Sequence, residues 1–453
     1  MSNELDFATK NGWTHYADEQ SRKDMDALAA DYIDFLNAKT ERETVSRVVE
    51  KLRQAGYSED FTKDLVFRTW RGKAVFAARK GKKPLSEGVR LISAHTDAPR
   101  LDFKQRPLQE QVGVGQAKTH YYGGIRKYQW ATIPLAMHGV VILKDGTSVD
   151  ICIGEKEGDP VFCVTDLLPH LAAQQNERKL KDGIKGEELN IIVGSLPYPC
   201  EEEDSIKEPV KLLALSILNE RFGMTEKDFL RAEIEFVPAV KATDVGLDRS
   251  LVGAYGQDDK VCAYTALTAE MKAKSPEYTT VTILADKEEI GSVGNTGLNS
   301  DFTLHYIEGL CKAGNVDVRK VLKHSLCLSA DVNAAYDPTF ASVFEEKNSC
   351  YLNKGVVLTK YTGARGKSGS NDASAETMAK VIQIMDEAGV YWQIGELGAV
   401  DVGGGGTVAL FVAGMDVDVV DMGVPILSMH APFELASKLD IYNTYLAFAA
   451  FCS

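Results

Sequence analysis

The chain of 453 residues is too long for one ordinary hydrophobic core, so its length favours two domains. Its 44% hydrophobic and 26% charged residues are typical of a soluble globular protein, and no apolar run reaches the ~20 residues that span a bilayer. A formal net charge of −14 argues against nucleic acid or an anionic membrane as a partner, because no basic block offsets it.

The cysteines and the N-terminal stretch both predict a cytoplasmic location. The eight cysteines are scattered without any Cys-x-x-Cys pair, which is typical of buried thiols in a reducing compartment rather than of a disulfide framework. Residues 1–10 are polar and acidic, without the apolar segment of a secretory signal.

The first hundred residues predict two helices followed by two strands. Residues 20–56 carry apolar side chains at helical spacing and end at a glycine. Short apolar runs at 73–79 and 88–94 are typical of buried strands. The second run leads directly into His-Thr-Asp at 95–97.

Residues 101–244 differ in character from the parts on either side. Short alternating segments dominate, and an Asp-Gly pair at 145–146 between runs at 139–144 and 148–154 predicts a β-hairpin. A helix is expected at 209–222. We interpret 101–244 as an inserted, β-rich domain.

Helices and strands alternate again after residue 245. Residues 1–100 and 245–453 therefore predict one discontinuous α/β domain that the insert interrupts. The expected helices are 258–272, 302–314, 373–389, 408–415 and 438–451, and the expected strands are 280–285, 324–329, 355–360 and 416–421.

The stretch 281–292 carries the clearest chemical signal. An apolar run ends in four charged residues and then a glycine, which predicts a buried strand that delivers Glu288 and Glu289 to the carboxyl edge of a sheet. Adjacent side chains on extended backbone point to opposite sides, so one glutamate can bind a metal while the other faces a metal-bound water. These residues alone do not decide which glutamate does which, and a solvated loop is the alternative interpretation of an isolated pair.

Histidine and carboxylate residues also follow other predicted strands. Ligand sites in open α/β sheets lie beyond the carboxyl ends of the strands, so these side chains can converge there. Imidazole and carboxylate donors suit zinc, cobalt or manganese. Each residue alone is more often structural, for example as a helix cap, and only the joint pattern predicts a metal site. The residues are His95, Asp97, Asp258, Asp259, Glu288, Glu289, Asp331 and His430.

Five short motifs, in this order, resemble the aspartyl aminopeptidase family of dinuclear zinc metallopeptidases. They are His-Thr-Asp at 95–97, Gln-Asp-Asp-Lys at 257–260, Glu-Glu-Ile-Gly-Ser at 288–292, Ser-Ala-Asp at 329–331 and Ser-Met-His at 428–430. The resemblance spans the chain. It implies a zinc-aminopeptidase-like catalytic domain with a central mixed sheet flanked by helices, interrupted by a β-rich insert for oligomerisation. It also implies a homo-oligomer, a dodecamer whose active sites face inward.

The resemblance further implies a set of metal ligands. One ion is expected on His95, Asp258 and Asp331, and a second on Asp258, Glu289 and His430, with Asp258 bridging. The two ions, zinc or else cobalt or manganese, would hold a hydroxide and polarise the scissile carbonyl.

Two further roles follow from the same resemblance. Glu288 is expected to be the general base that passes the proton of the water to the leaving amine. Asp97 is expected to accept the other N–H of His95 and fix its tautomer.

Two residues are expected at the substrate. His170, in the insert, matches a family histidine that reaches a neighbouring subunit's active site, and a plain surface histidine is the alternative. Lys360 is the best positional match for a cation that selects acidic N-terminal residues. The segments 361–371 and 402–407 depart from the family pattern, and the second suits its prokaryotic branch, so the preference for aspartate or glutamate stays open. The glycines at 403–406 lack the features of a nucleotide-binding loop.

We therefore expect a cytoplasmic dinuclear metalloaminopeptidase that acts on peptides, with acidic N-terminal residues as one preference. One alternative is a broad-specificity or deblocking-type aminopeptidase of the same fold. The other is a catalytically silent peptide-binding shell, against which the presence of every expected ligand and of the base argues.

Overall fold

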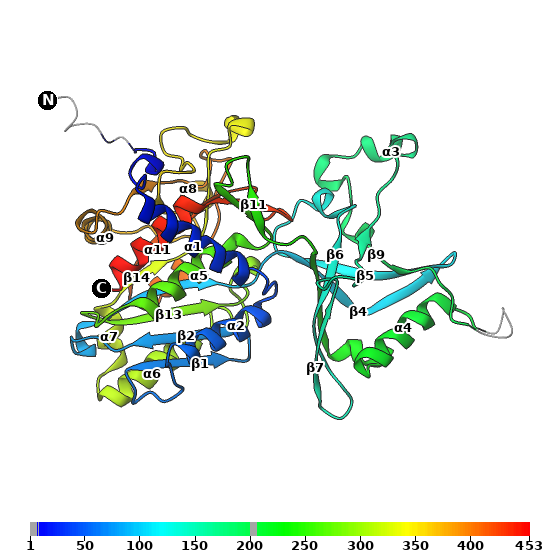
Figure 1. Ribbon diagram of the computed structural model, residues 1–453, viewed down its shortest axis with the longest axis horizontal. Coiled ribbons are helices and arrows are strands. Elements are labelled where there is room, and N and C mark those ends of the chain that lie inside the picture. The colour runs from blue at the N-terminus through cyan, green and yellow to red at the C-terminus, as the bar shows by residue number, and fades with distance from the viewer. Residues whose placement is uncertain (1–6, 8, 200–205) are drawn as a thin grey trace. The chain divides into compact units, whose positions relative to one another are not determined.

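The computed structural model describes residues 7, 9–199 and 206–453 (Figure 1). Cys200 and most of the stretch 1–10 lie outside the described residues, and the other seven cysteines are free thiols. The chain divides into two compact units. The larger comprises Met1–Asp97, Ala242–Met429 and Glu434–Ser453, and the smaller comprises Ala98–Lys241 with His430–Phe433.

An eight-stranded mixed sheet forms the centre of the larger unit. Its strands, in spatial order, are β1 (Leu65–Trp70), β2 (Ala74–Arg79), β13 (Thr279–Ala285), β3 (Val89–His95), β14 (Leu326–Ser329), β18 (Asp418–Gly423), β16 (Val356–Thr359) and β17 (Trp392–Ile394). The four strands β13, β3, β14 and β18 run parallel to one another, whereas β2 and β16 run antiparallel to their neighbours in this group. The four parallel strands therefore end at one edge of the sheet, which we call the carboxyl edge.

Helices cover both faces of this sheet (Figure 1). One core lies between the sheet and helices α1 (Glu19–Phe35), α2 (Glu41–Gln54), α5 (Gln257–Lys272), α9 (Ala375–Glu387) and α11 (Lys438–Phe451). The other core lies against α6 (Phe302–Gly314), α7 (Val318–Lys323) and α10 (Ala409–Ala413). Strand β13 is buried along its whole length, as expected of an apolar run covered on both faces.

A second, smaller sheet completes the larger unit. It contains β11 (Thr243–Val245), β12 (Leu251–Ala254), β20 (Glu434–Ser437), β19 (Pro425–Leu427) and β15 (Asn333–Ala334), in that order. These strands are too short to show a periodicity in the sequence, so none of them was predicted. None of the helices formed by described residues combines the length and apolar character that crossing a membrane requires.

The smaller unit is built on a seven-stranded antiparallel sheet. Its strands, in order, are β7 (Ser148–Ile153), β6 (Leu135–Ile142), β10 (Ala232–Pro238), β4 (Arg100–Gln111), β5 (Val114–Tyr122), β9 (Ile191–Gly194) and β8 (Cys163–Val164). The predicted hairpin is confirmed as β6 and β7, and Gly146 in its turn has a φ of +90° that favours glycine. Helix α4 (Pro209–Phe222) confirms the expected helix, and α3 (Ala173–Asn176) is a single turn. The predicted α/β class, with a mixed sheet and a β-rich insert, is confirmed.

Candidate metal centre

Acidic side chains gather around His95 at the carboxyl edge of the larger unit. His95 is the last residue of β3, while Asp331 and Glu288 follow the ends of β14 and β13. His95 Nε2 lies 3.3 Å from Asp258 Oδ1, 3.8 Å from Glu288 Oε2 and 4.0 Å from Asp331 Oδ1. One imidazole and three carboxylates from distant parts of the sequence therefore lie within reach of a common ion.

Asp258 and Asp259 lie in an irregular first turn of α5. Gly256, just before it, has a φ of +70°, and the peptide bond between the two aspartates is cis. Asp259 Oδ2 accepts the His95 backbone N–H at 3.2 Å. Candidate ligand atoms of His95, Asp259 and Asp331 lie within 4.8 Å of one another, and those of Asp258 and Glu289 are equally close. Asp259, which belongs to the predicted joint pattern but not to the ligand set that the resemblance implies, is thus a further candidate ligand.

The buried polar atoms of this cluster fit a metal ion. Among the described residues, Asp259 Oδ1 is buried and makes no hydrogen bond, and the buried His95 Nε2 faces only carboxylates, the nearest being that of Asp258 at 3.3 Å. Burial raises the pKa of Asp259 and of Asp331 well above the ordinary value, and the charge of Asp259 raises that of Asp331 further. Unpaired groups of this kind are unfavourable in a protein interior, whereas a divalent cation would satisfy them. Nitrogen and oxygen donors are also those that zinc accepts.

The His95 ring is surrounded by negative charge. Burial lowers the pKa of the imidazole, but hydrogen bonding to Asp258 and Asp97 outweighs burial and leaves the pKa well above its ordinary value. Glu288 contributes to the same effect. The charge that stabilises a protonated ring is the charge that would attract a cation.

Asp97 contacts three other residues of the cluster, His95, Glu288 and Glu289. Its Oδ1 lies 3.3 Å from His95 Nδ1, and its backbone oxygen lies 3.1 Å from the same nitrogen. The Asp97 carboxylate also accepts the backbone N–H of Glu288 at 3.1 Å and that of Glu289 at 3.2 Å. Asp97 therefore orients one imidazole and fixes the backbone of both glutamates, which makes it a positioning residue.

The two glutamates do not lie on extended backbone, and that prediction is wrong. Strand β13 ends at Ala285, Lys287 has a φ of +66°, and Glu288–Ile290 form a 3-10 turn. The first N–H groups of a helical turn have no partner within the turn, and the Asp97 carboxylate accepts two of them. This long-range contact replaces the strand geometry that the local sequence favours.

His430 belongs to the smaller unit, in the segment His430–Phe433. It is half-buried with a φ of +63°, and its Nδ1 lies 2.9 Å from the backbone oxygen of Gly124. In a neutral ring this contact places the proton on Nδ1, so that Nε2 is the nitrogen suited to a metal.

His170 is exposed on a 3-10 turn, Pro169–Leu171, of the smaller unit. Its predicted role requires a neighbouring subunit and stays a prediction.

Lys360 directly follows strand β16. Strand β16 runs antiparallel to β18, with Thr359 opposite Asp421, which in turn pairs with Ser329. Ser329 lies level with the residue two positions before His95. The register therefore sets Thr359, the last residue of β16, about two residues, or ~7 Å, below the level of His95.

The Lys360 ammonium forms an ion pair with a carboxylate. Its Nζ forms an ion pair with Asp372, and Lys367 Nζ lies 2.9 Å from the other oxygen of the same carboxylate. The three residues fasten the loop that follows β16. The role of Lys360 in substrate selection stays a prediction.

The glycine run at 403–406 lets two loops pack backbone against backbone. A Cβ on Gly403 would lie 1.9 Å from the Leu397 oxygen, and one on Gly404 would lie 2.5 Å from Ala364 Cα. This close approach accounts for both glycines without a bound phosphate.

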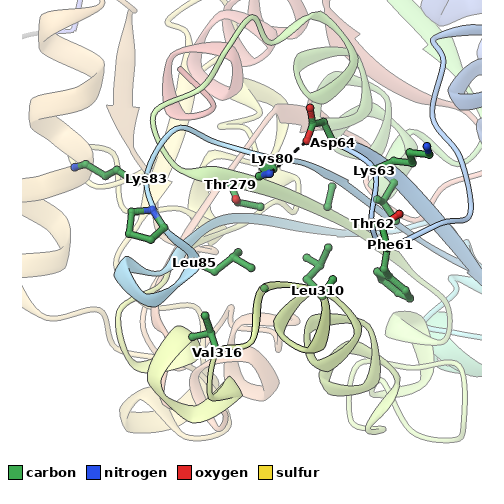
Figure 2. A pocket seen from close by; sticks show the side chains of 15 residues that line it. Phe61, Thr62, Lys63, Asp64, Lys80, Lys83, Leu85, Thr279, Leu310 and Val316 are labelled. Atoms are coloured by element: carbon green, nitrogen blue, oxygen red, sulfur yellow. Dashed lines mark ion pairs between the residues drawn. The ribbon is translucent and has the colours of Figure 1, made fainter.

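A pocket of about 320 Å³, whose lining residues are drawn in Figure 2, lies at the opposite end of the sheet from the cluster. It adjoins Thr279, the first residue of β13, whereas Glu288 follows the last. Lys80 and Asp64 form an ion pair of 3.6 Å at its rim. Its apolar walls include Phe61, Leu85, Leu310 and Val316. The lining also includes Thr62, Lys63, Lys83 and Thr279, none of which belongs to the cluster, and we assign no chemistry to this pocket.

A cluster of imidazole and carboxylate groups at the carboxyl edge of an α/β sheet defines a metal-dependent hydrolase. The chain belongs to the M18 family of aminopeptidase I zinc metalloproteases, whose family model matches residues 35–452. A probable M18 family aminopeptidase 1 of Clostridium acetobutylicum is 47% identical over 100% of this chain and 99% of its own length. One of Thermotoga maritima is 46% identical over 97% of each chain.

Solved structures agree with this assignment. The crystal structure of an M18 family aminopeptidase from Thermotoga maritima matches with a TM-score of 0.94 at 44% identity, covering 99% of this chain and all of the other. That of aminopeptidase I from Clostridium acetobutylicum matches with a TM-score of 0.93 at 42% identity, covering 99% of each. The protein is a metal-dependent aminopeptidase that hydrolyses peptide bonds, which confirms the predicted family and reaction.

Proposed function

We propose that this aminopeptidase holds two divalent cations at the carboxyl edge. His95, Asp258 and Asp331 would bind one ion, and Asp258, Glu289 and His430 would bind the other. The crowding of ligand atoms around His95 is the observation that carries this proposal. Family membership and the donor set favour zinc, and the same donors suit cobalt and manganese. When bound, two such ions polarise the scissile carbonyl and lower the pKa of the attacking water.

Glu288 would act as the general base. Its Oε2 lies 3.8 Å from His95 Nε2, and its side chain is 18% exposed, so the carboxylate borders both the cluster and solvent. A carboxylate in this place can take the proton of the attacking water and deliver it to the leaving amine nitrogen. Asp97 would keep Glu288 in position through the backbone hydrogen bond.

A preference for acidic N-terminal residues stays a prediction that depends on Lys360. The ion pair with Asp372 instead favours the alternative, an aminopeptidase of broad or deblocking-type specificity. A lysine that is already paired supplies little selectivity for a substrate carboxylate.

The smaller unit supports assembly into a homo-oligomer. Helix α4 carries apolar residues on several sides, and Leu212 and Ile217 are 37% and 46% exposed. A helix that is apolar around its circumference is normally covered on all sides. A yeast relative, 20% identical to this chain, is described as a dodecamer. We propose a dodecamer in which the exposed His170 reaches a neighbouring subunit's active site, in the reducing cytoplasm that the free thiols favour.

Metal removal and a substrate panel test this proposal together. Hydrolysis of aspartyl, glutamyl, leucyl and lysyl p-nitroanilides is measured before chelation, after chelation, and after zinc or cobalt is restored. The proposal predicts loss on chelation and recovery at two ions per chain. Full recovery at one ion per chain would contradict the dinuclear centre, and the ranking of the four substrates decides between acidic and broad specificity.

A further inference from the structure

The backbone of Asp258, the proposed bridging ligand, is held by the side chain of Glu434 on strand β20. The backbone angles of Asp258, φ −76° and ψ 106°, are not helical, and neither are those of Asp259. The Asp258 N–H donates to Glu434 Oε2 at 3.1 Å. Asp258 is 3% exposed and Glu434 is 1% exposed. A hydrogen bond from a backbone N–H to a buried carboxylate is charge-assisted and stronger than a neutral one, so it fixes the backbone at Asp258.

Strand pairing sets Glu434 in this place. Glu434 begins β20 and pairs with Ala254, the last residue of β12, only four residues before Asp258. The intervening Gln257 is buried, and its Nε2 donates to the Glu434 oxygen at 2.7 Å and to the Val252 oxygen at 3.1 Å. Hydrogen bonds to both the side chain and the backbone of Glu434 therefore connect the turn between β12 and α5 to β20.

We propose that Glu434 is a positioning residue of the metal centre, which fixes the bridging ligand Asp258 and thereby sets the affinity for the ions. Glu434 also follows His430 by four residues, so one short segment carries a ligand of the second ion and the support of the shared ligand. This inference rests on the proposed role of Asp258.

Removing the Glu434 carboxylate leaves the buried Asp258 N–H without this acceptor and frees the turn. Loss of an outer partner of a metal ligand typically lowers metal affinity by about 10–100-fold. We expect a loss of this size in Glu434→Ala. Glu434→Gln keeps an oxygen that can accept the N–H, so it should retain most of the affinity.

The test is a competition titration with a zinc chelator on the full-length protein, together with the melting temperature of the metal-free form. Asp440→Ala is the matched control. Asp440 is a fully buried carboxylate that accepts the backbone N–H groups of Asn353 at 2.7 Å and Gly355 at 2.9 Å, outside the cluster. Both alanine variants should melt at lower temperature, but only Glu434→Ala should lose zinc affinity, and Glu434→Gln should restore it.

Zinc affinity of Glu434→Ala within twofold of wild type, or an equal loss in Asp440→Ala, would overturn the inference. If Glu434→Ala does not fold, Glu434→Asp replaces it, because the shorter side chain keeps the charge and withdraws the acceptor. Asp258→Asn distinguishes a failure of the proposed ligand set from a failure of the positioning role of Glu434. Retention of both ions by Asp258→Asn contradicts the ligand set itself, whereas loss there with none in Glu434→Ala contradicts only the positioning role.

Discussion

An alanine in place of Gly423 tests whether Asp331 is a metal ligand. Gly423 is the last residue of β18, and a Cβ built on it would lie 1.8 Å from the backbone oxygen of Asp331. Because real Cβ contacts are essentially never shorter than 3.0 Å, the Gly423 and Asp331 backbones must separate by about 1.2 Å. Metal sites tolerate ligand shifts of only about 0.2–0.5 Å, and a misplacement of ~1 Å can lower activity by about 100-fold. We expect Gly423→Ala to lower kcat/KM by about 100-fold and to weaken zinc binding.

Gly81→Ala is the matched control for this experiment. A Cβ there would lie 2.2 Å from the Tyr278 carbonyl carbon, at the start of β13 and so at the far end of the sheet from the cluster. Both substitutions overpack backbone against backbone and should destabilise the fold by about 1–3 kcal/mol. Activity is measured with a p-nitroanilide at fixed free zinc, and stability by urea unfolding. Wild-type activity and zinc affinity in Gly423→Ala, at a stability loss like that of Gly81→Ala, would refute the assignment of Asp331.

Three further outcomes are expected. Asp97→Asn keeps one acceptor oxygen instead of two, so zinc affinity or kcat should fall by about 10–100-fold in a chelator titration and a rate assay, and an unchanged enzyme would contradict its positioning role. Burial raises the pKa of Asp421 to about 6 from 3.8, so ionisation is disfavoured in the folded state. The free energy of unfolding therefore contains a contribution of about 3 kcal/mol from Asp421 below pH ~4. This contribution is lost as the pH rises through ~6. Denaturant unfolding at several pH values should show that Asp421→Asn removes this fall in the free energy of unfolding. The same pH dependence in Asp421→Asn and wild type would contradict the prediction. Leu212→Lys together with Ile217→Lys should dissociate the oligomer in light scattering, whereas a monomeric wild type would rule out the assembly.

The sequence predicted the strands that carry the cluster because their apolar runs are long and interrupted by charge. Strand β13, expected at 280–285, is Thr279–Ala285, and α5, expected at 258–272, is Gln257–Lys272. The same local pattern is typical of parallel and antiparallel strands alike. It therefore did not reveal that β16 runs against β18.

Features that depend on distant partners were not predictable from local sequence. The 3-10 turn at Glu288 depends on Asp97, 191 residues earlier in the chain. Glu434 lies on β20, a strand of four residues with no periodicity to reveal it, and its contact with Asp258 spans 176 residues. Asp259 stands next to Asp258 in the sequence, and only the fold shows that its carboxylate faces His95.

Zinc content and turnover of Glu288→Gln and Glu289→Gln, measured side by side, test the central claim most directly. The two residues are adjacent in one turn, so each variant controls for the stability of the other. The account predicts that Glu288→Gln keeps both ions and loses turnover, because it removes the base, whereas Glu289→Gln loses an ion. Full turnover in Glu288→Gln, or metal loss in Glu288→Gln with none in Glu289→Gln, would contradict the assignment of base and ligand.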